Sequence, residues 1–197
     1  IWDTPDAPVI RAFLHFSKTS TGMTIDLSAI CIGDRGSFVI DWSRQKPQGN
    51  MILHSGDSYG RRGDVAEYVD IDVNAMLQAG YRYVLIQLNN YTNAPELEHN
   101  NYFGIMERTE PKSNEKWLPK TIENCMITSV KNKTNCAVID LKTREYIPID
   151  EDAGADGHIQ NASENDIKQL QELIKPPKFS VYDLLVLHAK GRGTQVA

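Results

Sequence analysis

The feature that most constrains the fold is a repeated alternation of apolar and polar residues. In Glu67–Val73, apolar residues at positions 69, 71 and 73 alternate with Tyr68, Asp70 and Asp72. A period of two residues puts the two sets on opposite faces of a β-strand, so this stretch predicts a half-buried strand with Asp70 facing solvent. Similar runs bounded by turn residues predict further strands at Val9–Phe16, Thr24–Ile32, Ser37–Trp42, Tyr81–Tyr91, Phe103–Thr109, Asn124–Val130, Cys136–Leu141 and Glu145–Ile149.

Helical signals are concentrated at the end of the chain. A capping-box-like start at Ser163–Asp166 precedes an apolar stripe formed by Ile167, Leu170, Leu173 and Ile174. A second helix is expected from Ser180 to a cap at Gly191, and a single helical turn at Asn74–Ala79. These patterns predict a mainly β protein: a two-sheet β-sandwich over residues 1–160, with a C-terminal helical extension, residues 161–197, packed on the same domain.

Charge and composition exclude several classes of function. The 197 residues carry a formal charge of −5, which gives no basic footprint for nucleic acid. The longest apolar runs are only a few residues, so we expect no transmembrane segment. Three dispersed cysteines, Cys31, Cys125 and Cys136, indicate buried reduced thiols and a cytoplasmic location. The chain begins with Ile1 rather than Met, which is compatible with a piece of a longer polypeptide.

The stretch from His54 to Glu67 carries the strongest signal for a ligand. It holds Asp57, Asp64 and Glu67, hydroxyl groups and three glycines that let backbone carbonyls converge. Calcium prefers six to eight oxygen ligands and tolerates irregular geometry. The sequence therefore predicts a calcium site in this loop, with Asp26 and Ser28 on the polar face of their strand as possible further ligands.

Other interpretations of the same residues stay open. The acids are also typical of an ordinary solvated loop, and Arg61 or Arg62 would neutralise them without a metal. A hydrolase built around His54 is a further hypothesis, although the adjacency of His54, Ser55 and Asp57 does not form a nucleophile elbow. The acidic stretch Asp150–Gly157 lacks the Glu that ends an EF-hand loop, so a solvated loop is expected there.

Four segments follow one another along the chain: Thr24–Ile32, the His54-Ser-Gly-Asp57 motif, Glu67–Asp72 and Tyr83–Tyr91. In this order they resemble the TerD family of bacterial tellurite-resistance and stress-response proteins. The resemblance spans roughly residues 9–150. The end of the chain, residues 176–193, is similar to that of longer TerD-like proteins.

The resemblance implies a calcium-binding β-sandwich that acts as a non-catalytic cytoplasmic module. Its setting would be a stress-response, tellurite-resistance or phage-defence system, and its partners other proteins or other domains of a longer chain. Asp26, Asp57 and Glu67 match acids of the family pattern. Thr24 stands where the pattern has an acid, which favours one calcium site over two. The alternative is a metal-free structural or protein-interaction domain with a degenerate calcium site.

Overall fold

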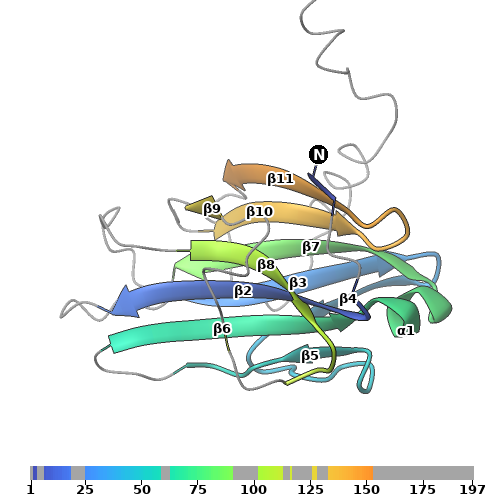
Figure 1. Ribbon diagram of the computed structural model, residues 1–197, viewed down its shortest axis with the longest axis horizontal. Coiled ribbons are helices and arrows are strands. Elements are labelled where there is room, and N and C mark those ends of the chain that lie inside the picture. Colours follow the sequence, from blue (N-terminus) through green and yellow to red (C-terminus); the bar gives the residue numbers. More distant parts are fainter. Residues whose placement is uncertain are drawn as a thin grey trace, which may run out of the picture.

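A computed structural model describes residues 2–3, 7–18, 25–58, 63–90, 102–112, 116, 126–127 and 133–152 of the chain. Their strands form two antiparallel sheets that face each other (Figure 1). One sheet has six strands in the order β1-β11-β10-β7-β3-β4, and the other has five in the order β5-β6-β2-β8-β9. The predicted mainly β, two-sheet sandwich is therefore confirmed.

The predicted strands all appear, with changes at their ends. The six-stranded sheet contains β1 (Trp2–Asp3), β3 (Ile25–Gly33), β4 (Gly36–Ile40), β7 (Tyr81–Asn90), β10 (Lys133–Asp140) and β11 (Glu145–Asp152). The five-stranded sheet contains β2 (Val9–Lys18), β5 (Ile52–His54), β6 (Gly63–Asp72), β8 (Tyr102–Arg108) and β9 (Met126–Ile127). Because β11 extends to Asp152, the first acids of the expected solvated loop at Asp150–Gly157 lie in a strand instead.

The core lies between the two sheets and is almost entirely aliphatic. Strands from both sheets contribute alternate residues to it, and the central positions are fully buried: Ile10, Ala12, Leu27, Ala29, Val69, Ile71, Val84, Ile86, Ile105 and Ile139. Cys31 and Cys136 are buried free thiols, as predicted, whereas Cys125 lies outside the described residues. Burial raises the pKa of the Cys31 thiol, which keeps it protonated.

One short helix closes an end of this core. Helix α1 (Val73–Gln78) follows β6 directly, and the Asp72 side chain caps it by accepting a hydrogen bond from the Ala75 amide at 2.9 Å. Val73 and Met76 are buried in the core. The expected helical turn is thus confirmed. The two C-terminal helices predicted within residues 161–197 lie outside the described residues, and no helix in the described part of the chain is long and apolar enough to cross a membrane.

The prediction that Asp70 faces solvent is wrong. Asp70 and Arg11 point away from the core on neighbouring strands, but both side chains are 0% exposed. The guanidinium donates two hydrogen bonds to the carboxylate, at 2.6 and 2.8 Å, and lies 3.8 Å from the centre of the Tyr68 ring. The Lys112 amide adds a third hydrogen bond to Asp70. A paired charge with this many partners is the usual condition for burying an ion.

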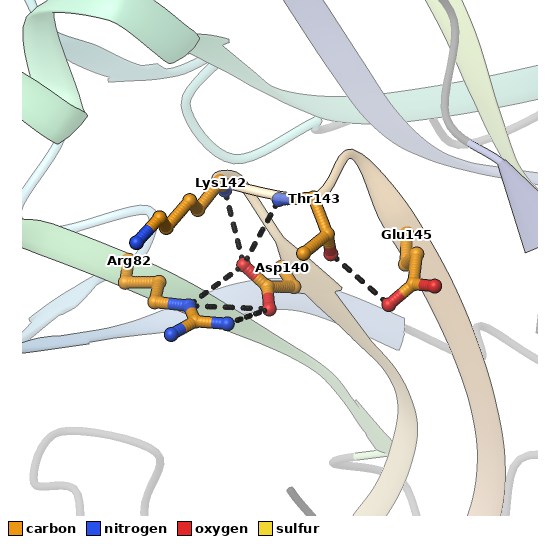
Figure 2. Close-up of polar contacts among 5 residues, drawn as sticks. All are labelled: Arg82, Asp140, Lys142, Thr143 and Glu145. Carbon is orange, nitrogen blue, oxygen red and sulfur yellow. Dashed lines mark hydrogen bonds and ion pairs between the residues drawn. The ribbon is translucent and has the colours of Figure 1, made fainter.

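A second carboxylate fixes the turn between β10 and β11 (Figure 2). Asp140 accepts hydrogen bonds from the Arg82 guanidinium and from the backbone amides of Lys142 and Thr143. Burial alone would raise the pKa of Asp140, but these donors lower it on balance. The Arg144 side chain of the same turn donates to the Ala7 carbonyl at 2.9 Å, just before β2. The turn therefore ties one sheet to the other.

The buried ion pair between Arg11 and Asp70 leads to a prediction about stability. We expect Asp70→Ala to lower the free energy of unfolding by about 3–5 kcal/mol, because it removes the carboxylate that neutralises the buried Arg11 guanidinium. Glu107→Ala is the matched control: it removes an exposed carboxylate from the same sheet and is expected to change stability by no more than about 0.5 kcal/mol. Urea unfolding measures both, and equal losses in the two variants would contradict this role for the pair.

Candidate metal centre

The candidate site lies beside the first residues of strand β3, which extend beyond the end of the neighbouring strand β4. Strand β4 ends at Ile40, whose register partner on β3 is Ala29, so among the described strands none pairs with the first residues of β3 on that side. On the other side, Leu27 pairs with Leu88 of β7. An unpaired strand edge leaves amide and carbonyl groups that need other partners.

Two side chains from the opposite sheet take the place of the missing strand. The Leu27 amide donates to Glu67 Oε2 at 2.9 Å, and the Leu27 carbonyl contacts His54 Nε2 at 2.9 Å. Glu67 lies on β6 and His54 ends β5, so both belong to the five-stranded sheet. This arrangement, here called the Leu27 clamp, links the two sheets at the open side of the sandwich.

The hydrogen bonds of His54 define its state. The Gly56 amide donates to Nδ1 at 2.9 Å, so Nδ1 accepts and Nε2 carries the proton that it donates to Leu27. Burial lowers the pKa of His54, which keeps the ring neutral. Both ring nitrogens are thus committed to backbone groups, and the geometry does not support the hydrolase hypothesis, which needs a free nitrogen as general base.

The loop after His54 folds back toward Glu67. Ser55 exchanges hydrogen bonds with the Tyr68 backbone, donating from its amide at 2.9 Å and accepting at its hydroxyl at 3.0 Å. Gly56 follows with a φ of 88°, in the region that favours glycine. The Ser58 amide then donates to Glu67 Oε1 at 3.1 Å. These contacts place Asp57 beside the Leu27 clamp.

Three carboxylates meet at this point. Asp26, Asp57 and Glu67 each offer an oxygen, and the three oxygens lie within 4.8 Å of one another. Asp26 and Glu67 are buried, and Asp57 is partly buried. Such a group of oxygens suits a hard cation such as Ca²⁺, which binds carboxylates, carbonyls and hydroxyls at about 2.3–2.6 Å.

The electrostatics of the group are unfavourable for three negative charges. Burial raises the pKa of Glu67 most strongly, and the charges of Asp26 and Asp57 add to the rise, whereas the hydrogen bonds from Leu27 and Ser58 oppose it. The resulting pKa is about 8. Two unit charges 4.8 Å apart repel by about 3.5 kcal/mol at an effective dielectric constant near 20. A cation among the three oxygens would offset this cost.

Two buried oxygens in this region, one of them from Asp57, have unused hydrogen-bonding capacity. Asp57 Oδ1 and Ser28 Oγ are buried and have no hydrogen-bond partner among the described residues. Ser28 is fully buried and lies two residues after Asp26, on the same face of β3. Buried polar atoms in folded proteins rarely lack a partner, and a bound ion can supply one. The residues present therefore fit a calcium ion.

The structure brings together most of the residues that the sequence singled out. Asp26, Asp57 and Glu67 converge, and Glu67 lies in a strand as predicted, but this strand, β6, begins earlier than expected, at Gly63. Asp64 also lies on β6, and its side chain is outside the described residues. Arg61 and Arg62 lie entirely outside the described residues, so the hypothesis that they neutralise the acids of the loop stays a prediction.

The structural role of His54 was missed by sequence reasoning. The sequence placed His54 next to Asp57 but gave no sign that its ring binds a backbone 27 residues away. A polar residue ending a short apolar run, Met51–Leu53, was the available signal. The binding of His54 to an unpaired strand edge can be predicted only when the pairing of β3 with β4 is known.

Two solved structures share this fold. One is described as a homologue of the telluride resistance protein TerD, SCO6318 from Streptomyces coelicolor A3(2), and the other as SAV2460, a protein of unknown function. Each is 12% identical to this chain with a TM-score of 0.53, and each match covers 75% of this chain and 93% of the solved one. No protein-family model and no curated protein matches the sequence. The chain therefore has a TerD-like fold.

The pKa of Glu67 predicts a pH dependence of stability. In metal-free protein the Glu67 carboxyl binds its proton more tightly when folded, with a pKa of about 8 against an ordinary value of 4.5. Its contribution to stability is therefore fully present below about pH 4.5 and is lost as the pH rises to about 8. Glu67→Gln is neutral at every pH, so its stability should fall less than that of the native chain over this range.

Thermal unfolding of metal-free protein across this pH range measures the effect. Glu107→Gln, which removes an exposed carboxylate from the same sheet, should keep the native pH profile. Parallel curves for the native chain and Glu67→Gln would contradict the raised pKa.

Proposed function

We propose that this chain is a non-catalytic interaction module that binds one calcium ion at the Leu27 clamp. Asp26, Asp57 and Glu67 would ligate the ion, with Ser28 and Asp64 as additional ligands. The observation that carries the proposal is the convergence of three acidic side chains from β3, β6 and the loop between β5 and β6, two of them buried. The buried oxygens of Asp57 and Ser28 support it, since they have no partner among the described residues.

The donor set favours calcium over other metals. All candidate ligands are oxygens, which excludes the thiolate and imidazole sites typical of zinc and copper. His54 is committed to backbone groups at both nitrogens, so it is not a ligand. The glycine-containing loop gives irregular geometry, which calcium tolerates and magnesium does not. One bound ion would change the formal charge from −5 to about −3, by adding two positive charges.

The ion would organise the surface formed by the loop after His54. Binding only the folded state, it would stabilise the loop and present it to a protein partner or to another domain of a longer chain. The biological setting that we propose is a cytoplasmic stress-response, tellurite-resistance or phage-defence system. This setting is supported by the TerD-like fold and by the description of one structural neighbour as a telluride resistance protein homologue.

Calcium binding predicts a thermal shift. At a free calcium concentration one hundred times its Kd, the ion stabilises the folded state by about 2.7 kcal/mol. For a chain of this size each kcal/mol raises Tm by about 2–4 °C, so we expect a shift of about 5–10 °C relative to chelator. Magnesium at the same concentration should give a clearly smaller shift.

Variants make this test specific to the site. Asp57→Asn should abolish the calcium shift, whereas Asp34→Asn, which changes an exposed acid in the β3–β4 turn, should retain it. A native chain that calcium does not stabilise, or an equal shift in Asp57→Asn, would remove the proposal. The metal-free alternative predicts the first of these results. It also predicts that changing Arg61 and Arg62 together to Ala either destabilises the loop or restores some calcium binding.

A further inference from the structure

A row of aliphatic side chains crosses the outer face of the six-stranded sheet, away from the core. The strand register places one residue of the row on each of five neighbouring strands. Each is one position away along its strand from residues that enter the core, such as Ala29, Ile86 and Ile139, so the row points to the opposite face. The members of this outer row are Val39, Ile30, Leu85, Val138 and Ile147.

The outer row is buried except for Ile147, which is partly buried, although no described strand or helix lies across it. Ile30 is 1% exposed, Leu85 2% and Val138 0%. Their described apolar neighbours, Tyr83 and Ile149, lie on strands of the same sheet, and helix α1 packs on the core instead. Aliphatic side chains on an uncovered sheet face keep a substantial exposed surface, so the described strands of this sheet do not by themselves account for the burial of the row.

The position and composition of the remaining segments favour the end of the chain. Residues 153–197 form the longest one, and they follow β11, which is itself a strand of this sheet. Residues 113–125 begin where the Lys112 amide binds Asp70 of the other sheet, and they return to β9 of that sheet. Residues 91–101 are mostly polar.

We propose that residues 161–190 dock on the outer row, with the apolar stripe of a helix facing Ile30, Leu85 and Val138. The stripe consists of Ile167, Leu170, Leu173 and Ile174. A helix over residues 163–175 would be about 20 Å long, comparable with the ~19 Å that separate the outermost of five adjacent strands. This inference is independent of calcium binding and makes the C-terminal extension part of the sandwich.

Docking has a consequence for association. An uncovered apolar row of this kind promotes association between molecules, so soluble domains avoid exposing one or use it to bind a partner. In this chain the cover would come from its own C-terminal segment. Asp26 and Ser28 precede Ile30 on the same face of β3, so the docked segment would border the candidate metal centre.

Site-specific photo-cross-linking of the full chain tests this placement. Tyr83 is partly buried beside the outer row, and p-benzoylphenylalanine at this position keeps an aromatic ring there. After irradiation we expect the main cross-link, identified by mass spectrometry, to join position 83 to peptides from residues 161–190. The same probe at Trp42, an exposed residue in the loop after β4, should not give this product.

Two matched variants separate a docked helix from chance proximity. Leu173→Gln, within the stripe, should reduce the cross-link at least several-fold, whereas Glu172→Gln, on the opposite face of the predicted helix, should leave it unchanged. Circular dichroism and melting curves establish that each variant is folded. Mixing isotope-labelled with unlabelled protein identifies cross-links between two copies. Cross-links to other segments, cross-links between copies, the absence of any cross-link, or an unchanged yield in Leu173→Gln would each overturn the proposal.

Discussion

The Leu27 clamp is the interaction on which the rest of the candidate site depends. Strand β4 is too short to pair with the first half of β3, and the exposed backbone must bind something else. Glu67 and His54 bind it from the opposite sheet. The neutral imidazole of His54 and the carboxylate of Glu67 thereby make the hydrogen bonds that a neighbouring strand would otherwise make. The clamp joins the two sheets at their open side and brings Glu67 to the edge of β3, next to Asp26.

The use of Glu67 to bind the Leu27 amide has an electrostatic cost. Glu67 is needed as a hydrogen-bond acceptor, yet it is buried beside two other acids, and its pKa rises to about 8 as a result. Either a proton or a cation has to compensate the charge. If the proposed ion binds, the hydrogen bonding at the edge of β3 and the binding of the ion would depend on each other through Glu67. The loop after His54 carries the third acid, Asp57, and closes on Glu67 through the Ser58 amide.

The alternation of residues predicted nearly every strand, because a period of two residues is a direct consequence of strand geometry. It did not predict which outer faces are covered, so Asp70 was expected in solvent although Arg11 buries it. The composition of the loop after His54 and the resemblance to the TerD family, rather than the alternation, grouped Asp26, Asp57 and Glu67. The alternation did not reveal the role of His54, whose partner is a backbone carbonyl, nor the start of β6 at Gly63, because the first two residues of this strand, Gly63 and Asp64, are of types common in loops.

The central claim is that the acids around the Leu27 clamp hold one calcium ion. A crystal structure of the full chain grown in millimolar calcium tests it most directly. The account predicts a single ion bound by oxygens of Asp26, Asp57 and Glu67, six to eight oxygens in all, at about 2.3–2.6 Å. A site that stays empty in calcium, or that is filled by the guanidinium of Arg61 or Arg62, would contradict it.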